Sequence, residues 1–138
     1  GSHGIPVMVD TVFRKGEISQ SQGLILPGGM PGAQNLYLHE GLRKSLIAHN
    51  MRETLIAAIC AAPIVLGRRD LLNGRRATSY PGFEDELHGA HIVNERVCED
   101  GHIITARGPG CVNDFAFAIA ARFVDSATLS RVKSDMLL

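Results

Sequence analysis

The sequence has no net charge and no long apolar run, and each absence excludes a class of protein. Its 14 Lys and Arg residues balance its 14 Asp and Glu residues, so no overall field draws the chain towards nucleic acid or an anionic membrane. Apolar residues make up 45% of the chain, but every apolar run is interrupted before it reaches the roughly 18 residues typical of a membrane span. We therefore expect a soluble protein with a small neutral or self-complementary partner.

Cysteine pairs and metal-binding patterns are also missing. The cysteines at positions 60, 98 and 111 form no CxxC pair, and the six histidines show no HExxH spacing. The sequence therefore predicts free thiols in a reducing, cytoplasmic setting, with neither a metal nor another cofactor. No signal peptide is visible, and Gly1-Ser2-His3 is compatible with a cleaved tag or with a native segment.

Strands and helices are expected to alternate in the first half of the chain. A short buried strand at 23–26 ends at Pro27-Gly28-Gly29, and residues 38–47 have the spacing of a helix. Residues 54–59 are apolar on both faces, which is typical of a central parallel strand. Cys60 ends that strand, and a helix over residues 61–66 follows.

The second half of the chain continues this alternation. The remaining expected elements are a turn at 15–17, a strand at 77–80, a hairpin of strands at 94–97 and 102–106 with its turn at 99–101, a helix at 115–124 and a last helix at 129–136. This order predicts a doubly wound α/β fold, with residues 1–138 forming one domain.

The start of the chain differs from that of a complete fold of this kind. Doubly wound folds open with a strand, a helix and a second strand, whereas nothing precedes Pro6 that could supply them. We expect the opening unit to have been cleaved and to remain bound, to be a separate chain, or to be missing from a truncated protein. Without it, the sheet would have an unpaired edge in its core.

Cys60 is the leading candidate for a chemically active group. It lies where a buried strand passes into a helix, and open α/β sheets bind ligands at the carboxyl ends of their strands. Ala58 and Ala62 are small enough for the tight turn that a nucleophile needs there. The N–H groups that begin the next helix, with those of Gly28 and Gly29, can stabilise a thiolate or an oxyanion. The alternative is that Cys60 is a small buried core residue.

Four motifs follow one another along the chain. They are Leu26-Pro27-Gly28-Gly29, residues 32–36 (GAQNL), residues 55–63 (LIAAICAAP), and Arg107-Gly108-Pro109-Gly110 followed by Asp114-Phe115-Ala116. Together they resemble the ThiJ/PfpI superfamily, in the branch of the human Parkinson-linked protein deglycase and its bacterial relative YajL. The resemblance implies a flavodoxin-like three-layer sandwich, usually a homodimer. It also implies that Cys60 is an oxidation-sensitive nucleophile and that Gly29 and Ala61 supply backbone N–H groups.

The chain departs from this family pattern in two places. The family's thiol is paired with a glutamate in the opening strand-helix unit, which the sequence lacks. Where the human protein has a histidine in a Thr-His-Pro sequence, this chain has Ser79-Tyr80-Pro81. Because a tyrosine is a poor base near neutral pH, the sequence does not support a Cys-His dyad.

The resemblance also implies a function. It predicts a cofactor-free, cysteine-dependent glyoxalase or deglycase acting on reactive aldehydes such as methylglyoxal, or on their adducts with proteins. The alternative is an oxidative-stress sensor or redox-regulated chaperone that uses Cys60 oxidation, and a cysteine peptidase is a weaker one. Tyr80, Arg107 and Pro109 are expected to line the substrate pocket. The expected partners are the substrate, a second copy of the chain and a cleaved N-terminal segment, with no nucleic acid and no membrane.

Several other residues have two open interpretations. Cys98 or Cys111 could resolve an oxidised Cys60, but no spacing motif links them and incidental thiols are favoured. Arg107 is expected to form either a structural ion pair or a ligand contact. A basic cluster could hold an anion, although a solvated surface is favoured; it consists of Arg68, Arg69, Arg75 and Arg76. Three histidines are expected at the surface or in turns, namely His49, His88 and His102.

Overall fold

Helices and strands alternate in the computed structural model, which describes residues 1–14 and 18–138. The predicted turn at 15–17 lies outside the described residues. The α-helices are α1 (Gly32–Leu38), α2 (Glu40–Met51), α3 (Pro63–Gly67), α4 (Val112–Ala120) and α5 (Ser126–Asp135). The strands are β1 (Gly23–Leu26), β2 (Leu55–Ile59), β3 (Arg76–Ala77), β4 (His91–Ile92), β5 (Val97–Asp100) and β6 (Ile103–Ala106). Three short 3-10 turns are η1 (Ile18–Gln20), η2 (Glu84–Glu86) and η3 (Pro109–Cys111).

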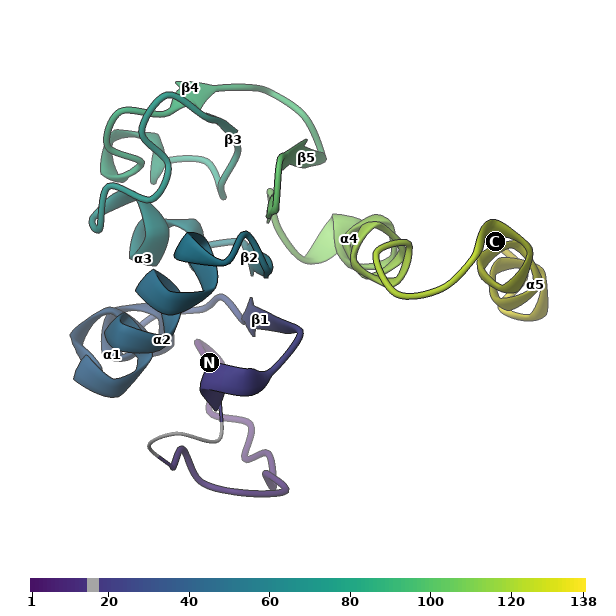
Figure 1. Cartoon of the computed structure of the whole chain (residues 1–138), viewed down its shortest axis with the longest axis horizontal. Coiled ribbons are helices and arrows are strands. Elements are labelled where there is room, and N and C mark those ends of the chain that lie inside the picture. Colours follow the sequence, from purple (N-terminus) through teal and green to yellow (C-terminus); the bar gives the residue numbers. More distant parts are fainter. Residues whose placement is uncertain (15–17) are drawn as a thin grey trace.

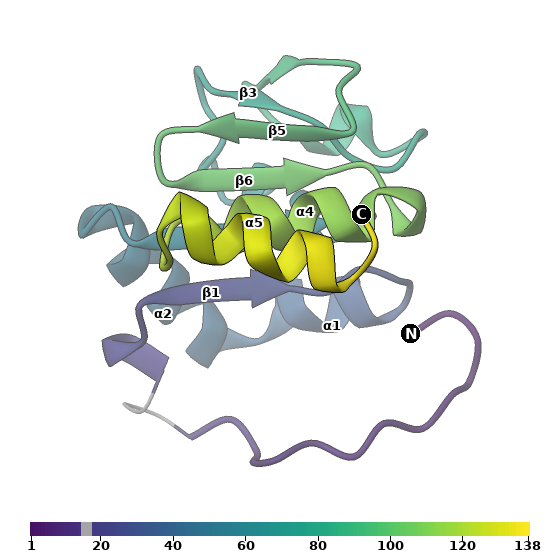
Figure 2. The same ribbon diagram turned by 90° about the vertical axis from the view of Figure 1, so that its right-hand side faces the viewer.

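The central sheet has four strands in the order β1-β2-β6-β5. Figure 2 shows β1, β6 and β5 in this order, with α4 and α5 in front of the sheet. Strands β1, β2 and β6 are parallel, with Leu24 opposite Ile56 and Ile56 opposite Ile103. Strand β5 runs antiparallel to β6, and β3 and β4 form a separate parallel pair. The carboxyl ends of the three parallel strands therefore lie at one edge of the sheet, where ligands are expected.

Helices cover both faces of the sheet (Figure 1). Ile56 of β2 belongs to the apolar core that contains Leu46 of α2 and Ile64 of α3. Its neighbour Ala57 points to the other face and belongs to the core that contains Phe115 of α4. Both faces of β2 are buried, which is why its sequence is continuously apolar. The predicted α/β sandwich with a mostly parallel sheet is confirmed.

The predicted helix at 38–47 corresponds to α2, and α1, which the sequence did not predict, precedes it. Helices α1 and α2 meet at His39, whose backbone is extended. The ring nitrogen Nδ1 of His39 accepts the N–H of Leu42 at 3.0 Å, so this side chain caps α2. A histidine cap has no simple sequence signature, and the apolar spacing continues across the break.

Two predicted strands also have different bounds. The strand at 77–80 is reduced to β3 because the N–H of Thr78 donates to Thr105 Oγ1 and that of Tyr80 donates to the Cys60 carbonyl. In the hairpin, the residues at positions 99 and 100 lie in β5, so the turn forms at Gly101, whose φ is 60°. Glycine adopts this conformation without the steric cost of a side chain.

The prediction that His49 lies at the surface or in a turn is wrong. His49 is fully buried, and its ring nitrogens lie 3.1 Å from the Ile18 carbonyl oxygen, 3.2 Å from Ser21 Oγ and 2.7 Å from Thr54 Oγ1. These contacts join η1 to α2 and to the start of β2. His102 is half-buried beside Asn50, and burial lowers the pKa of its ring.

The predicted last helix corresponds to α5, which lies beyond α4 in Figure 1. Asp125 begins it, because its carboxylate accepts the N–H of Thr128. None of its residues is buried, so α5 adds little to the core. Within residues 1–14 and 18–138, no helix is long and apolar enough to cross a membrane.

Strand β1 forms an outer edge of the four-stranded sheet in the part of the chain that the structure describes. Its inner neighbour is β2, and Ile25 in its middle is 55% exposed. The unpaired edge that the sequence predicts therefore runs along β1.

Candidate active site

Cys60 lies where β2 ends, in a conformation that L-residues rarely adopt. Its φ is 65°, in the left-handed region that favours glycine. Two backbone hydrogen bonds hold it there: its N–H donates to the Ala106 carbonyl, and its carbonyl accepts the N–H of Tyr80, both at 2.9 Å. The side chain is partly exposed. A strained, partly exposed thiol at this edge of the sheet fits a functional group better than a core residue.

The glycine loop after β1 lies against the Cys60 turn. A Cβ atom on Gly28 would be 2.6 Å from Cys60 Cβ and 2.7 Å from the Ile59 carbonyl oxygen, so only glycine fits. Within residues 1–14 and 18–138, the N–H groups of Gly28, Gly29 and Ala61 donate to no protein acceptor. These unused donors belong to the Cys60 turn and to the glycine loop packed against it, as expected of groups that stabilise an oxyanion.

Helix α3 contributes less than the sequence predicts. It begins at Pro63 and has five residues, and the N–H groups of Ala62 and Ile64 donate within the turn itself. Of the N–H groups expected to begin the helix at 61–66, mainly that of Ala61 therefore remains available to the thiolate.

Replacing Gly28 by Ala is expected to distort the Cys60 turn. The new methyl group would overlap backbone atoms that cannot rotate away, which typically costs about 1–3 kcal/mol of stability. A displacement of this size at a reacting atom can lower activity by about a hundredfold. Thermal unfolding and the alkylation rate of Cys60 measure the two effects. Gly32→Ala is the matched control because a Cβ there meets nothing within 4 Å, and equal results for both variants would contradict the close approach.

The first residues of the chain lie beside this glycine loop. A Cβ on Gly29 would be 3.2 Å from both Gly1 Cα and Ser2 Oγ. Ser2 Oγ also accepts the N–H of Met30 at 3.1 Å. The glycine loop therefore contacts the first residues of the chain as well as the Cys60 turn.

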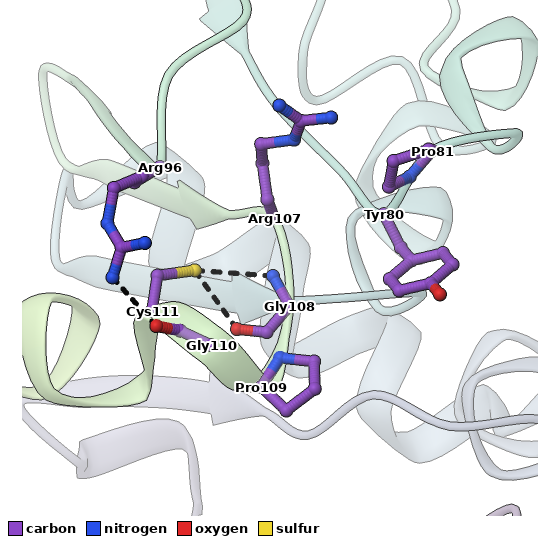
Figure 3. Close-up of a pocket in the computed structure, with 8 residues that line it drawn as sticks. All are labelled: Tyr80, Pro81, Arg96, Arg107, Gly108, Pro109, Gly110 and Cys111. Atoms are coloured by element: carbon purple, nitrogen blue, oxygen red, sulfur yellow. Dashed lines mark hydrogen bonds between the residues drawn. The ribbon is translucent and has the colours of Figure 1, made fainter.

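A hollow of about 350 Å³ opens around the loop at residues 107–111 (Figure 3). Its lining residues are Tyr80, Pro81, Arg96, Arg107, Gly108, Pro109, Gly110 and Cys111. The structure thus brings together the three residues expected in the substrate pocket. Cys60 itself does not line the hollow, but it is hydrogen-bonded to Tyr80 and to the residue before Arg107.

Arg96 also lines this hollow, although the sequence analysis did not predict it as a site residue. Its guanidinium donates to Asp114 Oδ2 at 2.8 Å and to the Gly110 carbonyl at 2.7 Å. The N–H of Arg107 donates to the Arg96 carbonyl, because the hairpin pairs Val97 with the residue before Arg107. Arg96 lies here because Val97 pairs with Ala106, a pairing that the turn predicted at 99–101 does not give.

The other two cysteines are shielded from solvent. Cys98 is 1% exposed, and burial raises the pKa of its thiol, so it is poorly suited to attack an oxidised Cys60. Cys111 is 4% exposed, and its sulfur contacts the N–H and the carbonyl of Gly108 at 3.3 and 3.0 Å. Cys111 lines the hollow and therefore stays the better candidate for a resolving thiol.

The basic cluster is largely neutralised. Arg68 pairs with Glu86, Arg75 with Asp100 and Arg76 with Glu95, while Arg69 lies over the Tyr37 ring and donates to the Tyr37 carbonyl. The hydrogen bond from Arg68 lowers the pKa of Glu86. These contacts fit a structural surface better than an anion site. Across the residues that the structure describes, no three His, Cys, Asp or Glu side chains gather as they would around a metal.

Comparison with known proteins identifies the family. The sequence model of the DJ-1/PfpI family matches residues 1–122. The chain belongs to the DJ-1/PfpI family. The resemblance predicted from the four motifs is thereby confirmed.

Individual relatives support the same family. The chain is 35% identical to protein DJ-1 homolog A of Arabidopsis thaliana, over 99% of the chain and 36% of that protein. It is 36% identical to the Parkinson disease protein 7 homolog of Danio rerio, over 83% of the chain and 62% of that protein. A deglycase of Pyrococcus abyssi is 33% identical over 80% of the chain and 67% of its own length. The chain thus spans about a third to two thirds of the length of these relatives.

A solved structure supports the fold. The crystal structure of Drosophila melanogaster DJ-1beta superposes with a TM-score of 0.81 at 32% identity, covering 88% of this chain and 67% of that one. The DJ-1/PfpI fold neighbour has the same flavodoxin-like layout of helices around a mostly parallel sheet.

Proposed function

We propose that Cys60 is the nucleophile of a deglycase or glyoxalase-type site that acts on reactive aldehydes or on their adducts with proteins. The observation that carries the proposal is the position of Cys60, held in a left-handed turn against Gly28, with the N–H groups of Gly29 and Ala61 unused in the two adjoining loops. Membership of a family that contains named deglycases supports the choice of reaction.

The proposed reaction begins when the Cys60 thiolate attacks the aldehyde carbon of methylglyoxal. A C–S bond forms, and the carbonyl oxygen becomes an oxyanion that accepts the N–H groups of Gly29 and Ala61. The hydrogen on that carbon then moves to the neighbouring carbonyl carbon, and water releases the thiol and leaves lactate. The sum is methylglyoxal plus water giving lactate and a proton, so no cofactor is required.

The proton transfer needs a general acid or base. In the described part of the chain, no titratable side chain is hydrogen-bonded to the Cys60 sulfur. We propose that the glutamate of the opening strand-helix unit, implied by the family resemblance, supplies it. A homodimer and a bound N-terminal segment remain part of the same proposal.

The direct test is cofactor-free lactate formation from methylglyoxal, followed by NMR. The comparison is the same protein after iodoacetamide has alkylated Cys60, as verified by peptide mass. We expect alkylation to abolish lactate formation. The proposal fails if the alkylated protein forms lactate at an unchanged rate.

A second candidate function is a sensor of oxidative stress or a redox-regulated chaperone. The observation that favours it is the contrast in exposure, since Cys60 is partly exposed while Cys98 and Cys111 are buried. An oxidant should therefore reach Cys60 first. We expect stoichiometric peroxide to add one or two oxygen atoms to Cys60 alone, as measured by peptide mass. Equal oxidation of all three cysteines would contradict this selectivity.

A further inference from the structure

The backbone nitrogen of Ala61 directly follows Cys60 and has no hydrogen-bond partner in the described part of the chain. The N–H groups on either side are used, since that of Cys60 donates to the Ala106 carbonyl and that of Ala62 donates to the Ile59 carbonyl. Ala61 is nevertheless buried, and buried N–H groups are nearly always hydrogen-bonded. This nitrogen is therefore available for reaction without loss of a hydrogen bond within the protein.

The Ala61 nitrogen and the Cys60 side chain face the same glycine loop. A Cβ atom on Gly28 would be 2.6 Å from Cys60 Cβ and 3.1 Å from the Ala61 nitrogen. The Cys60 carbonyl accepts the N–H of Tyr80 at 2.9 Å, which fixes the plane of the peptide bond between Cys60 and Ala61. With this backbone fixed, one torsion, about the Cys60 Cα–Cβ bond, decides how close the sulfur comes to the nitrogen.

The two other thiols are poorly placed to trap an oxidised Cys60. Cys98 and Cys111 are both buried, whereas Cys60 is partly exposed. Cys111 is the better candidate of the two, but its sulfur is engaged with the N–H and the carbonyl of Gly108. A sulfenic acid condenses either with a thiol or with a backbone nitrogen. The Ala61 nitrogen is the partner that lies nearest along the chain.

We propose that Cys60 and the Ala61 nitrogen form a cyclic sulfenamide when hydrogen peroxide oxidises the thiol. The inference rests on the second candidate function, oxidation of Cys60. Peroxide first transfers one oxygen atom to the sulfur, which gives a sulfenic acid and water. The Ala61 nitrogen then displaces that oxygen as a second water, so an S–N bond forms while the N–H and S–O bonds break. Two thiol molecules reverse the step, because they restore the Cys60 thiol and the N–H and leave as a disulfide.

Ring closure keeps the oxidised state of Cys60 reversible. A sulfenic acid that gains a second oxygen atom becomes a sulfinic acid, which ordinary thiols do not reduce. Closure of the ring competes with that second oxidation. It also consumes both the Cys60 thiol and the Ala61 N–H, the nucleophile and one oxyanion donor of the proposed reaction. The aldehyde chemistry therefore stops while the ring is closed and resumes after reduction by thiols.

The direct test is the mass of the tryptic peptide 53–68 after equimolar peroxide, which catalase then removes. This peptide contains Cys60 as its only cysteine and has no lysine whose amine could react instead. We expect its mass to rise by one oxygen atom and then to fall to two hydrogen atoms below that of the thiol peptide. Fragment ions should place the loss at Cys60 and Ala61, and dithiothreitol should restore the original mass.

Each other outcome of this experiment is decisive. A peptide 53–68 that stops at one added oxygen atom, or that gains two, overturns the sulfenamide but leaves the oxidation of Cys60 standing. A peptide whose mass never changes overturns both the sulfenamide and the second candidate function.

Removal of the other thiols excludes a disulfide. A disulfide also removes two hydrogen atoms, but it joins peptide 53–68 to a second peptide. The matched control therefore combines Cys98→Ala with Cys111→Ala, and we expect the same loss from peptide 53–68. If the loss disappears in this double variant, another thiol takes part and the inference is wrong.

Ala61→Pro removes the hydrogen that the S–N bond must replace. Because the Ala61 N–H donates to no protein acceptor in the described part of the chain, the change costs the fold no hydrogen bond. We expect its peptide 53–68 to gain oxygen atoms and never to lose two hydrogen atoms. A two-hydrogen loss in this variant contradicts a bond to that nitrogen. If the variant does not fold, the fragment ions of the unaltered protein decide.

Discussion

Replacing Cys60 by Ala is expected to abolish lactate formation from methylglyoxal, with a loss on the order of a thousandfold or more. The reason is that the other two thiols cannot substitute for it, since Cys98 and Cys111 are 1% and 4% exposed. The measurement is the initial rate of lactate formation at matched protein concentration. Cys98→Ala is the control, and it should retain the rate because this thiol lies away from the site hollow.

A change from Cys60 to Gly separates loss of chemistry from loss of fold. Cys60 has a φ of 65°, and a residue with a side chain costs about 1 kcal/mol or more in this region relative to glycine. We therefore expect Cys60→Gly to raise the melting temperature slightly while it removes all activity. A variant that is both inactive and less stable would show that Cys60 contributes to the fold as much as to the site, and retained activity would contradict its role as nucleophile.

The position of Cys60 could be predicted because several local signals agree. Three features indicate a strand that passes into a helix: the apolar run before Cys60, the alanines that flank it, and Pro63 as the first residue of the helix. The left-handed backbone at Cys60 could not be read directly, because cysteine has no preference for it. The close approach of Gly28 follows only from the packing of two loops that are separated by more than thirty residues.

The sequence-based predictions that were wrong or incomplete concern residues whose positions depend on contacts between distant parts of the chain. His49 has the neighbours of an exposed helical residue, but Ser21 and Thr54 supply hydrogen bonds that allow its burial. The hairpin register was shifted because Glu99 and Asp100 suggest a turn, whereas pairing with β6 keeps them in a strand. Arg96 was missed for the same reason, since its place beside Arg107 depends on that register.

Replacing Gly67 by Ala is expected to cause the largest loss of stability of any small substitution considered for this chain. Gly67 is buried at the end of α3, where a Cβ atom would be 2.2 Å from the Glu86 carbonyl oxygen and 2.5 Å from Leu87 Cα. Alanine normally stabilises a helix relative to glycine, but both contacts here are backbone atoms that cannot rotate away. We expect a loss of about 3 kcal/mol. For a domain of this size that lowers the melting temperature by roughly 10 °C, measured by circular dichroism.

The matched variants identify which contact is responsible. Gly32→Ala places the same methyl group in open space at the start of α1 and should leave the melting temperature nearly unchanged. Glu86→Gln removes the ion pair with Arg68 without moving the backbone, and because both side chains are partly exposed it should cost less than about 1 kcal/mol. If Gly67→Ala unfolds like Glu86→Gln, the loss reflects the displaced ion pair. A much larger loss places its cause in the contact of α3 with the Glu86-Leu87 backbone, which positions the helix that follows Cys60.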